Sequence, residues 1–441
     1  MLGRPQISDG DLFVTGKLYS QQRYVAINPN ILASGSEALS ATGPRRPGWQ
    51  QVTAPVVLQV IPGLDAGGAE RTTIDIAKAL IASGYRALVA TEGGRLERDL
   101  MLAGGEIIRA KMASKSPHRI IINAVALANI IRSQNVSIVH ARSRAPAWSA
   151  LIAARMTGAA FVTTYHGIYN AKGPLKRWYN SVMARGDAVI ANSQWTARHI
   201  LATYRFPPKN LTIIPRGMDL AYFDPNHVSS ERVATMRDWW LAKDRERMIL
   251  LPGRLTRWKG QLVFVRALAR MKREGFLPSG VRAVIAGGLQ GHNSYVSEMI
   301  ALIKESGLED VVVVSDHVTD MAAAYLAADI VVSASTDPEA FGRVPPEAAA
   351  MGRPVIATDH GGARETVRSG ETGLLVTPGS ATALAEALRD LLARSPADLK
   401  AMGAKGRAHI QANFTVERMC ADTLDVYRKL IDRPRKSTPR D

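Results

Sequence analysis

Short runs of β-branched and aliphatic residues recur along the chain, and each is followed by a turn and then by apolar residues at helical spacing. Runs of this kind are typical of parallel strands that are buried on both faces. Strands that alternate with helices predict a doubly wound α/β sheet. The predicted strands cover residues 55–61, 87–90, 107–110, 137–140, 160–164 and 187–191 and, after a gap, 247–251, 281–286, 311–315, 330–333 and 355–358.

The gap divides this pattern into two Rossmann-like lobes, so we expect an α/β protein with a cleft between two doubly wound sheets. The first lobe is expected over residues 53–215 and the second over residues 216–415. Residues 416–441 are predicted to form a last helix and a basic tail. Residues 1–52 are rich in Gly, Pro, Ser and Gln without periodicity, which predicts a poorly ordered extension.

The stretch from Ser335 to Glu347 carries two carboxylates across a junction between a loop and a helix. Glu339 follows the end of a predicted strand, and Glu347 falls in the first turn of a predicted helix, where the helix dipole favours a negative charge. A carboxylate fixed there can accept two hydrogen bonds, which suits a vicinal diol such as the ribose of a nucleotide. Taken alone, such a pair is more often a helix-start charge and a solvated loop residue, and it is the surrounding residues that favour a binding site.

This stretch resembles the signature of glycosyltransferase family 4, the retaining glycosyltransferases of the GT-B fold. That signature has two glutamates separated by seven residues, with Phe-Gly after the first, and Glu339, Phe341, Gly342 and Glu347 match it. The resemblance covers roughly residues 55–430. It implies that Glu339, with Phe341 and Gly342, binds the donor hexose, that Glu347 binds the ribose, and that the last helix crosses back onto the first lobe. Arg343 is less usual at its position.

A pattern suited to binding phosphate follows the predicted strand at residues 247–251. Arg254 and Lys259 stand five residues apart between Gly253 and Gly260, where a helix opens and its backbone N–H groups are free. Arginine supplies a planar fork and lysine a movable point charge, a pair that suits a diphosphate. The resemblance implies that these two cations neutralise the leaving nucleoside diphosphate, so that no metal is expected. Gly287, after the next strand, is expected to border the nucleotide.

The first lobe repeats the arrangement of strand, glycine-rich turn and helix. Gly67 and Gly68 lie where backbone N–H groups can bind an anion, although glycines that serve only a tight turn are the alternative. Their spacing is not that of a dinucleotide fingerprint. The resemblance places this loop near the donor phosphates. It also implies that His166, directly after a strand, approaches the transferred sugar, whereas a lone histidine is otherwise more often structural.

Four basic residues of the first lobe are candidates for binding an anionic acceptor. Arg142 and Arg144 follow a strand, and Lys176 and Arg177 lie in a predicted helix over residues 172–185 beside aromatic residues such as Trp178. Basic residues mixed with tryptophan favour a membrane surface. A solvated helix face whose aromatic residues turn into the core remains the alternative.

The charge of the chain lies mainly in the first lobe. The net charge is +17, and residues 107–215 hold 15 basic residues against one acidic residue, Asp187. Such a field attracts polyanions: nucleic acid, anionic lipid or a phosphorylated glycolipid. Cys420 is the single cysteine, no secretory signal is visible, and the apolar runs are too short to span a bilayer. We therefore expect a cytoplasmic protein, with the inner face of the plasma membrane as its site of action.

The leading hypothesis is a retaining, metal-independent hexosyltransferase with no cofactor beyond its nucleoside-diphosphate sugar. We expect Arg254, Lys259, Glu339 and His166 to act on the reaction, and a lipid-linked or lipopolysaccharide-core saccharide to be the acceptor. A nucleotide-sugar epimerase on a related fold is one alternative. A non-catalytic polyanion-binding protein is another, but no nucleic-acid-binding module is visible, so we expect no nucleic-acid partner.

Overall fold

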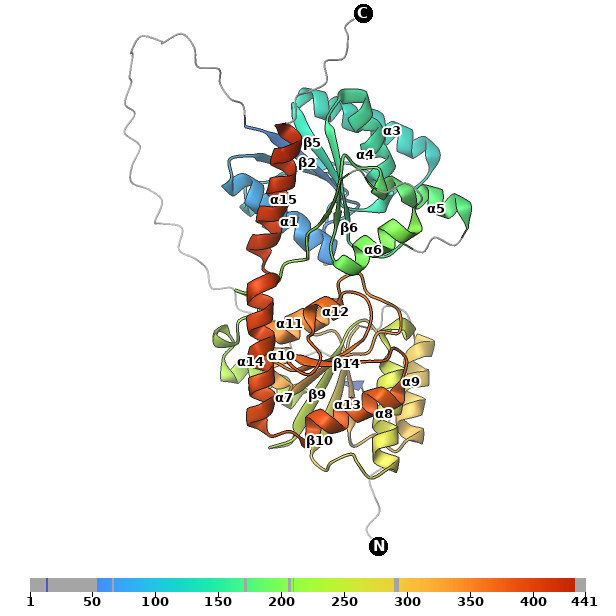
Figure 1. Ribbon diagram of the computed structural model, residues 1–441, viewed down its shortest axis with the longest axis vertical. Coiled ribbons are helices and arrows are strands. Elements are labelled where there is room, and N and C mark those ends of the chain that lie inside the picture. The colour runs from blue at the N-terminus through green and yellow to red at the C-terminus, as the bar shows by residue number, and fades with distance from the viewer. Residues whose placement is uncertain are drawn as a thin grey trace, which may run out of the picture.

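The computed structural model describes residues 13–14, 54–65, 67–169, 173–204, 208, 210–288 and 293–432. Two α/β lobes are stacked along the long axis of the molecule (Figure 1). Each lobe holds one parallel sheet of seven strands with helices on both faces. The predicted fold class, two Rossmann-like doubly wound lobes, is therefore confirmed.

The first sheet has the strand order β4-β3-β2-β5-β6-β7-β8. Its strands are β2 (Val56–Val60), β3 (Arg86–Thr91), β4 (Glu106–Arg109), β5 (Val136–Ala141), β6 (Ala160–Tyr165), β7 (Ala188–Ala191) and β8 (Leu211–Ile213). Its helices are α1 (Gly68–Ala82), α2 (Glu97–Leu102), α3 (Pro117–Ser133), α4 (Arg144–Thr157), α5 (Pro174–Asn180) and α6 (Gln194–Thr203).

The second sheet has the order β1-β11-β10-β9-β12-β13-β14. Its strands are β1 (Phe13–Val14), β9 (Arg247–Pro252), β10 (Val281–Ala286), β11 (Val312–Ser315), β12 (Ile330–Ser333), β13 (Val355–Thr358) and β14 (Gly373–Val376). The helices α7 (Ser230–Trp239), α8 (Gln261–Arg273), α9 (Asn293–Glu305), α10 (Met321–Ala327), α11 (Val344–Ala350), α12 (Ala363–Thr366) and α13 (Ala381–Ala393) belong to the same lobe.

Both sheets are buried on both faces because alternate residues of each strand enter different cores. Val56 and Leu58 of β2 pack on one side of the first sheet, and Val57 packs on the other. In the second lobe, Ile249 and Leu250 of β9 divide in the same way. This explains why the strands read as continuous apolar runs in the sequence.

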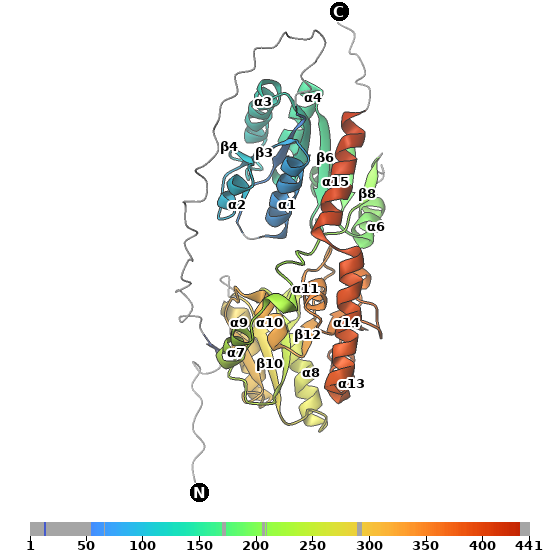
Figure 2. The same cartoon turned by 90° about the vertical axis from the view of Figure 1, so that its left-hand side faces the viewer.

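The last two helices connect the lobes. α14 (Pro396–Asn413) lies along the second lobe and α15 (Val416–Ile431) along the first, and together they form a column at one side of the molecule (Figure 2). Between these two helices, the segment around Thr415 runs parallel to the segment around Met218, which leads from the first sheet to the second lobe. Met218 donates its N–H to the carbonyl of Phe414 at 2.7 Å, and Val416 donates to the carbonyl of Met218 at 3.2 Å.

Two predictions for the ends of the chain fall largely outside the described residues. Of the extension predicted over residues 1–52, only β1 is described, and it pairs in parallel with β11. The predicted basic tail lies outside the described residues beyond Asp432. The single helix predicted over residues 172–185 is instead α5 followed by a short 3-10 helix over Ser181–Ala184.

Candidate active site

The topology of the second sheet brings two loops together. Its strand order reverses between β9 and β12, and the loops that follow these strands lie at the carboxyl edge, where open α/β sheets bind ligands. The loops are tied to each other because Thr336 donates its N–H to the carbonyl of Trp258 at 2.8 Å. Lys259 comes from the first loop and Glu339 from the second.

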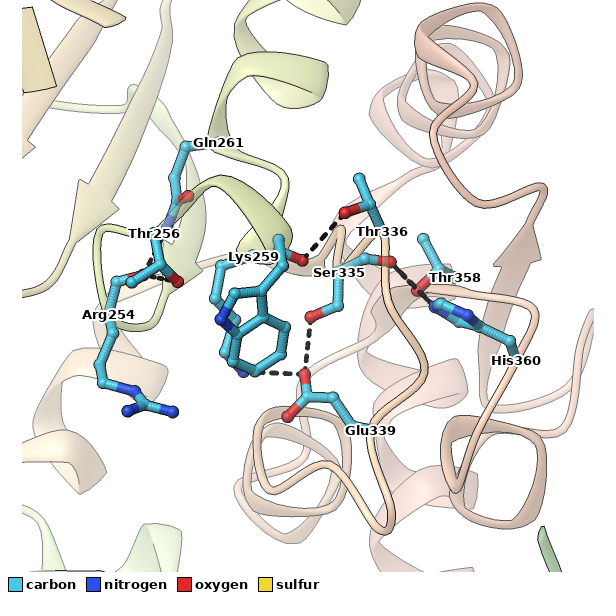
Figure 3. Close-up of polar contacts among 10 residues, drawn as sticks. Arg254, Thr256, Lys259, Gln261, Ser335, Thr336, Glu339, Thr358 and His360 are labelled. Atoms are coloured by element: carbon cyan, nitrogen blue, oxygen red, sulfur yellow. Dashed lines mark hydrogen bonds and ion pairs between the residues drawn. The ribbon is translucent and has the colours of Figure 1, made fainter. Parts of the chain in front are cut away.

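Lys259 and Glu339 form an ion pair that is shielded from water. Lys259 Nζ lies 2.8 Å from Glu339 Oε1, and the two side chains are 13% and 21% exposed. Ser335 Oγ donates a hydrogen bond to the same oxygen at 2.6 Å (Figure 3). Two donors therefore fix one oxygen of Glu339 and leave the other to bind a ligand. The ammonium of Lys259 also lies 4.6 Å from the centre of the Trp258 ring.

Arg254 stands at the edge of the same loop with its guanidinium exposed. Its backbone is fixed, because Gln261 donates from Nε2 to the Arg254 carbonyl at 3.0 Å and the Tyr295 hydroxyl donates to Gln261 Oε1 at 2.9 Å. Within the described residues, no carboxylate forms an ion pair with the Arg254 guanidinium, whose Cζ lies 5.8 Å from the centre of the Trp258 ring and which makes no polar contact with the residues drawn in Figure 3. A rigid backbone with a free cation is suited to binding an incoming anion.

Glu347 is buried at the start of α11, where only 6% of the residue is exposed. Tyr325 OH donates to its Oε2 at 2.9 Å, and the Arg343 guanidinium lies 2.7 Å from its Oε1. Burial, and next the charge of Glu347, raise the pKa of Tyr325 well above its usual value. The tyrosine therefore remains a hydrogen-bond donor that orients the carboxylate.

The loop between the two glutamates is shaped by Phe341 and Gly342. The Phe341 side chain is 2% exposed and packs near Phe414, so this ring serves the core of the second lobe and does not face a ligand. Gly342 has φ +75°, a left-handed conformation that other residues rarely adopt. Gly287, at the end of β10, donates its N–H to the carbonyl of Ser315.

The glycine-rich loop of the first lobe meets two charged side chains. A Cβ atom on Gly67 would overlap the carboxylate of Glu70, and a Cβ atom on Gly68 would lie 2.4 Å from Nη1 of Arg216. A side chain at position 68 would therefore displace the guanidinium of Arg216. The N-terminus of α1, predicted to bind phosphate, has a carboxylate and a guanidinium against it.

His166 follows β6 at the carboxyl edge of the first sheet. Arg216 donates from Nη2 to His166 Nδ1 at 3.1 Å, and His166 Nε2 is buried without a partner among the described residues. Burial, Arg142, Arg216 and His140 all hold the pKa of His166 well below its usual range, so the ring is neutral near pH 7.

The predicted anion-binding residues of the first lobe do not lie together. Arg142 is 2% exposed and its Nε lies 3.4 Å from Thr73 Oγ1, so that it is buried, and its part in acceptor binding stays a prediction. Its side chain contacts α1 through Thr73. Arg144 instead lines a cavity of about 320 Å³ with Pro62, Ala113, Lys115, Ser143, Ala145 and Tyr169. Lys176 and Arg177 are exposed on α5 and do not line this cavity.

A set of polar contacts links the loop that follows β12 in the second lobe to the first lobe. The hydroxyls of Ser193 and Thr196 both donate to the carbonyl of Ala340, the neighbour of Glu339. The carboxylate of Glu365, from α12, accepts hydrogen bonds from the backbone N–H groups of Gln194 and Trp195 at 2.9 and 3.0 Å. A side chain of one lobe therefore caps a helix of the other.

Several residues of this site escaped the sequence analysis. Tyr325 and Glu365 carry no recognisable local pattern, and Arg216 entered only as the first residue of the predicted second lobe. Ser335 opened the predicted stretch without a role. Among the described residues, no three or more His, Cys, Asp or Glu side chains gather where they could hold a metal ion.

Two family models match the chain, one in each lobe. Residues 66–222 match Glycosyltransferase Family 4, and residues 234–409 match Glycosyl transferases group 1. A crystal structure of a glycosyltransferase from Rickettsia africae is 34% identical, has a TM-score of 0.78, and aligns over 86% of this chain and 100% of that one. The chain belongs to the GT-B glycosyltransferases.

Other relatives of this GT-B glycosyltransferase agree on the fold. HepE of Anabaena, solved in complex with UDP and glucose, is 24% identical with a TM-score of 0.73, and covers 85% of this chain and 100% of that chain. D-inositol 3-phosphate glycosyltransferase of Kineococcus radiotolerans is 34% identical over 262 residues, 57% of this chain and 59% of that protein. The match thus spans less than two thirds of the length of this curated relative. No helix within the described ranges is long and apolar enough to cross a bilayer.

Proposed function

We propose that the protein transfers a hexose from a nucleoside-diphosphate sugar to a phosphate-bearing acceptor, with retention of configuration at the anomeric carbon. The observation that carries this proposal is the joint placement of Lys259, Glu339 and Ser335 at the switch point of the second sheet, beside the free cation of Arg254. Glu347, buried and held by Tyr325, completes a site whose charges match the parts of a nucleotide sugar.

In this proposal the donor lies across the carboxyl edge of the second sheet. Glu347 accepts hydrogen bonds from the ribose hydroxyls, and the unshared oxygen of Glu339 accepts one from the hexose. When the bond between the anomeric carbon and the phosphate oxygen breaks, the electron pair leaves with the diphosphate. Arg254 and Lys259 stabilise that charge, the kind of preorganised contribution that is worth about 3 kcal/mol or more. The acceptor hydroxyl attacks on the same face and passes its proton to a phosphate oxygen.

The first lobe supports the acceptor class of this proposal. The cavity at Lys115 and Arg144 has the positive charge and size for a phosphorylated saccharide or polyol. Curated relatives are named for an inositol phosphate acceptor, and a lipid-linked or lipopolysaccharide-core saccharide offers the same phosphate chemistry. Lys115→Gln and Arg144→Gln are expected to raise KM for a phosphorylated acceptor and to leave nucleotide binding unchanged.

Contact with a membrane is the second part of the proposal. Leu175 and Trp178 are 78% and 54% exposed on α5, beside Lys176 and Arg177. Exposed apolar side chains flanked by cations suit the surface of an anionic bilayer on the cytoplasmic side. Flotation with vesicles containing phosphatidylglycerol should capture the protein, and Trp178→Ser should weaken this capture. Equal flotation with phosphatidylcholine vesicles alone would contradict it.

The test of the donor site is calorimetry with UDP, GDP, ADP and their hexose conjugates. One nucleotide should bind to the wild type, and Arg254→Ala and Glu347→Ala should each weaken its binding at least tenfold, whereas Arg273→Ala, an exposed control on α8, should not. A folded protein that binds none of the nucleotides would refute the proposal. NMR of the product then reads the anomeric configuration. Release of a modified hexose without any acceptor would favour the epimerase alternative.

A further inference from the structure

Three nitrogen atoms at the carboxyl edge of the first sheet are buried without an acceptor among the described residues. They are Arg142 Nη2, His166 Nε2 and Arg216 Nε. The three side chains are close enough for Arg142 and Arg216 each to act electrostatically on His166 and on each other. A group of buried donors without acceptors is costly, because each donor has lost its hydrogen bond to water.

The contact between Arg216 and His166 fixes the proton on the histidine ring. The guanidinium can only donate, so Nδ1 of His166 must accept through its lone pair at 3.1 Å. A neutral imidazole carries one proton, which is then on Nε2. A doubly protonated ring would place an N–H group directly against the arginine N–H group.

The groups around His166 all oppose its protonation. Arg142 and His140 come from the end of β5, and Arg216 comes from the connection to the second lobe. His140 is itself fully buried, with its two ring nitrogens 2.6 Å from Tyr427 OH and 2.7 Å from Thr164 Oγ1. No carboxylate is among the groups that shift the pKa of His166.

Arg216 is held in position by the parts of the site around it. Its guanidinium lies against Gly68 of the first lobe, and the carboxylates of Glu347 and Glu70 attract it, whereas the charges of Arg343 and Arg142 repel it. Its position therefore depends on both lobes. It can act on His166 only while these surroundings are in place.

We propose that Arg216 is a positioning residue that holds His166 as the Nε2–H tautomer, and so makes this histidine a fixed hydrogen-bond donor to an oxygen of the transferred hexose. The proposal rests on the proposed function for the identity of the oxygen, but not for the tautomer. His166 then acts as a neutral donor and does not serve as a general base at Nε2, because that nitrogen already carries its proton.

The decisive experiment is NMR of the full-length protein with 15N-labelled histidine, between pH 6 and 8. The ring signals of His166, assigned by their loss in His166→Gln, should show the Nε2–H pattern throughout. In Arg216→Met this pattern should give way to a mixture of tautomers, with the cationic ring at low pH. The value of kcat should fall about tenfold with KM unchanged, and its pH profile should show a decrease on the acid side. Arg98→Met, an exposed arginine on α2, is the matched control.

The experiment separates this proposal from the donor-site proposal. A wild-type ring protonated at Nδ1, or an unchanged tautomer in Arg216→Met, would overturn the role of Arg216 whether or not a nucleotide binds. Arg216→Gln, whose amide can still donate, should retain the wild-type tautomer and tests the same point if Arg216→Met does not fold.

The oxygen that His166 contacts is tested by adding ligands to the wild type. UDP-glucose, GDP-mannose and ADP-glucose are each compared with the matching nucleotide. A downfield shift of the His166 Nε2 proton that needs the hexose supports the assignment, and a shift with the nucleotide alone overturns it.

Discussion

The carboxyl edges of the two sheets share a topology but differ in how their charges are satisfied. In the second lobe, Lys259 is paired with Glu339, and Glu347 with Arg343 and Tyr325. In the described part of the first lobe, neither Arg142 nor Arg216 forms an ion pair with a carboxylate, although each has a buried nitrogen atom that lacks a hydrogen-bond acceptor. The second lobe thus carries a site whose charged groups are already oriented, whereas the first carries donors that lack an acceptor oxygen.

This difference shows that a shared fold does not fix how a site is prepared. An oriented carboxylate costs little to keep, because its hydrogen bonds are made before a ligand arrives. Buried cations without partners reduce the stability of the folded state, and are expected where a ligand supplies the missing acceptors. Variants that remove single groups from each lobe can test the comparison.

The largest effect is expected at Lys259. Lys259→Met removes a cation from the leaving diphosphate and leaves Glu339 without its partner, so kcat should fall by about 10²–10³-fold. Steady-state kinetics with the donor identified by calorimetry measures the loss. Arg257→Met, in the same turn but exposed and paired with Glu298, serves as the control. A loss of less than tenfold in Lys259→Met would mean that the ion pair does not act on the reaction.

A substitution of Tyr325 tests whether nucleotide binding depends on the prior orientation of the Glu347 carboxylate. Tyr325→Phe leaves Glu347 Oε2 without its buried donor, which should cost about 1.5–3 kcal/mol and weaken nucleotide binding about tenfold or more. Calorimetry and thermal unfolding report the two effects separately. A lower melting temperature with unchanged nucleotide affinity would assign Tyr325 to stability alone.

In the described part of the first lobe, the ionisation of one acid, Asp75, is disfavoured. Burial raises the pKa of Asp75 to about 6, against the opposing charges of Arg71 and Lys78. Because the folded state then binds more protons than the unfolded state, the free energy of unfolding should fall as the pH rises from about 4 to above 6. Asp75→Asn should remove this slope and stabilise the protein by about 1–2 kcal/mol at pH 7.5, with no gain below pH 4.

Urea unfolding at several pH values measures this effect. A steeper slope in Asp75→Asn, or a gain that is the same at pH 4 and pH 7.5, would contradict the assignment. Burial would then not be the dominant influence on the ionisation of Asp75.

The smallest effect is expected at the contact between the lobes. Glu365→Gln removes the charge that caps α6 from the other lobe, which should cost about 0.5–1 kcal/mol. Small-angle scattering should show a larger mean radius in the variant, because the lobes separate more readily. Glu371→Gln, an exposed carboxylate of the second lobe, is the control. Identical scattering of both variants would show that the cap does not hold the lobes together.

The strands of the second sheet could be predicted because their sequences are continuous apolar runs. The expected strands at 281–286, 330–333 and 355–358 coincide with β10, β12 and β13. β8 and β14 were not predicted, and both are edge strands that are partly exposed and short. Their weak apolar pattern follows from having a neighbour on only one side.

The site was less predictable because its partners come from distant parts of the chain. The spacing of Glu339 and Glu347 is local and visible in the sequence, but Tyr325 and Arg216 reach this region only through the fold. The burial of Arg142 could not be predicted either, because arginines are usually exposed and this one contacts Thr73 of α1 in the interior. Local sequence therefore indicates the chemistry, whereas the support for each group depends on tertiary packing.

The placement of α15 has a consequence for biosynthesis. Met419, Leu424 and Tyr427 pack into the core of the first lobe, and the Tyr427 hydroxyl contacts His140 within it. The lobe that leaves the ribosome first therefore lacks part of its interior until the last helix has been translated. Maturation of the N-terminal half must wait for the C-terminal half, so a stalled or truncated nascent chain would expose apolar surface to chaperones and proteases.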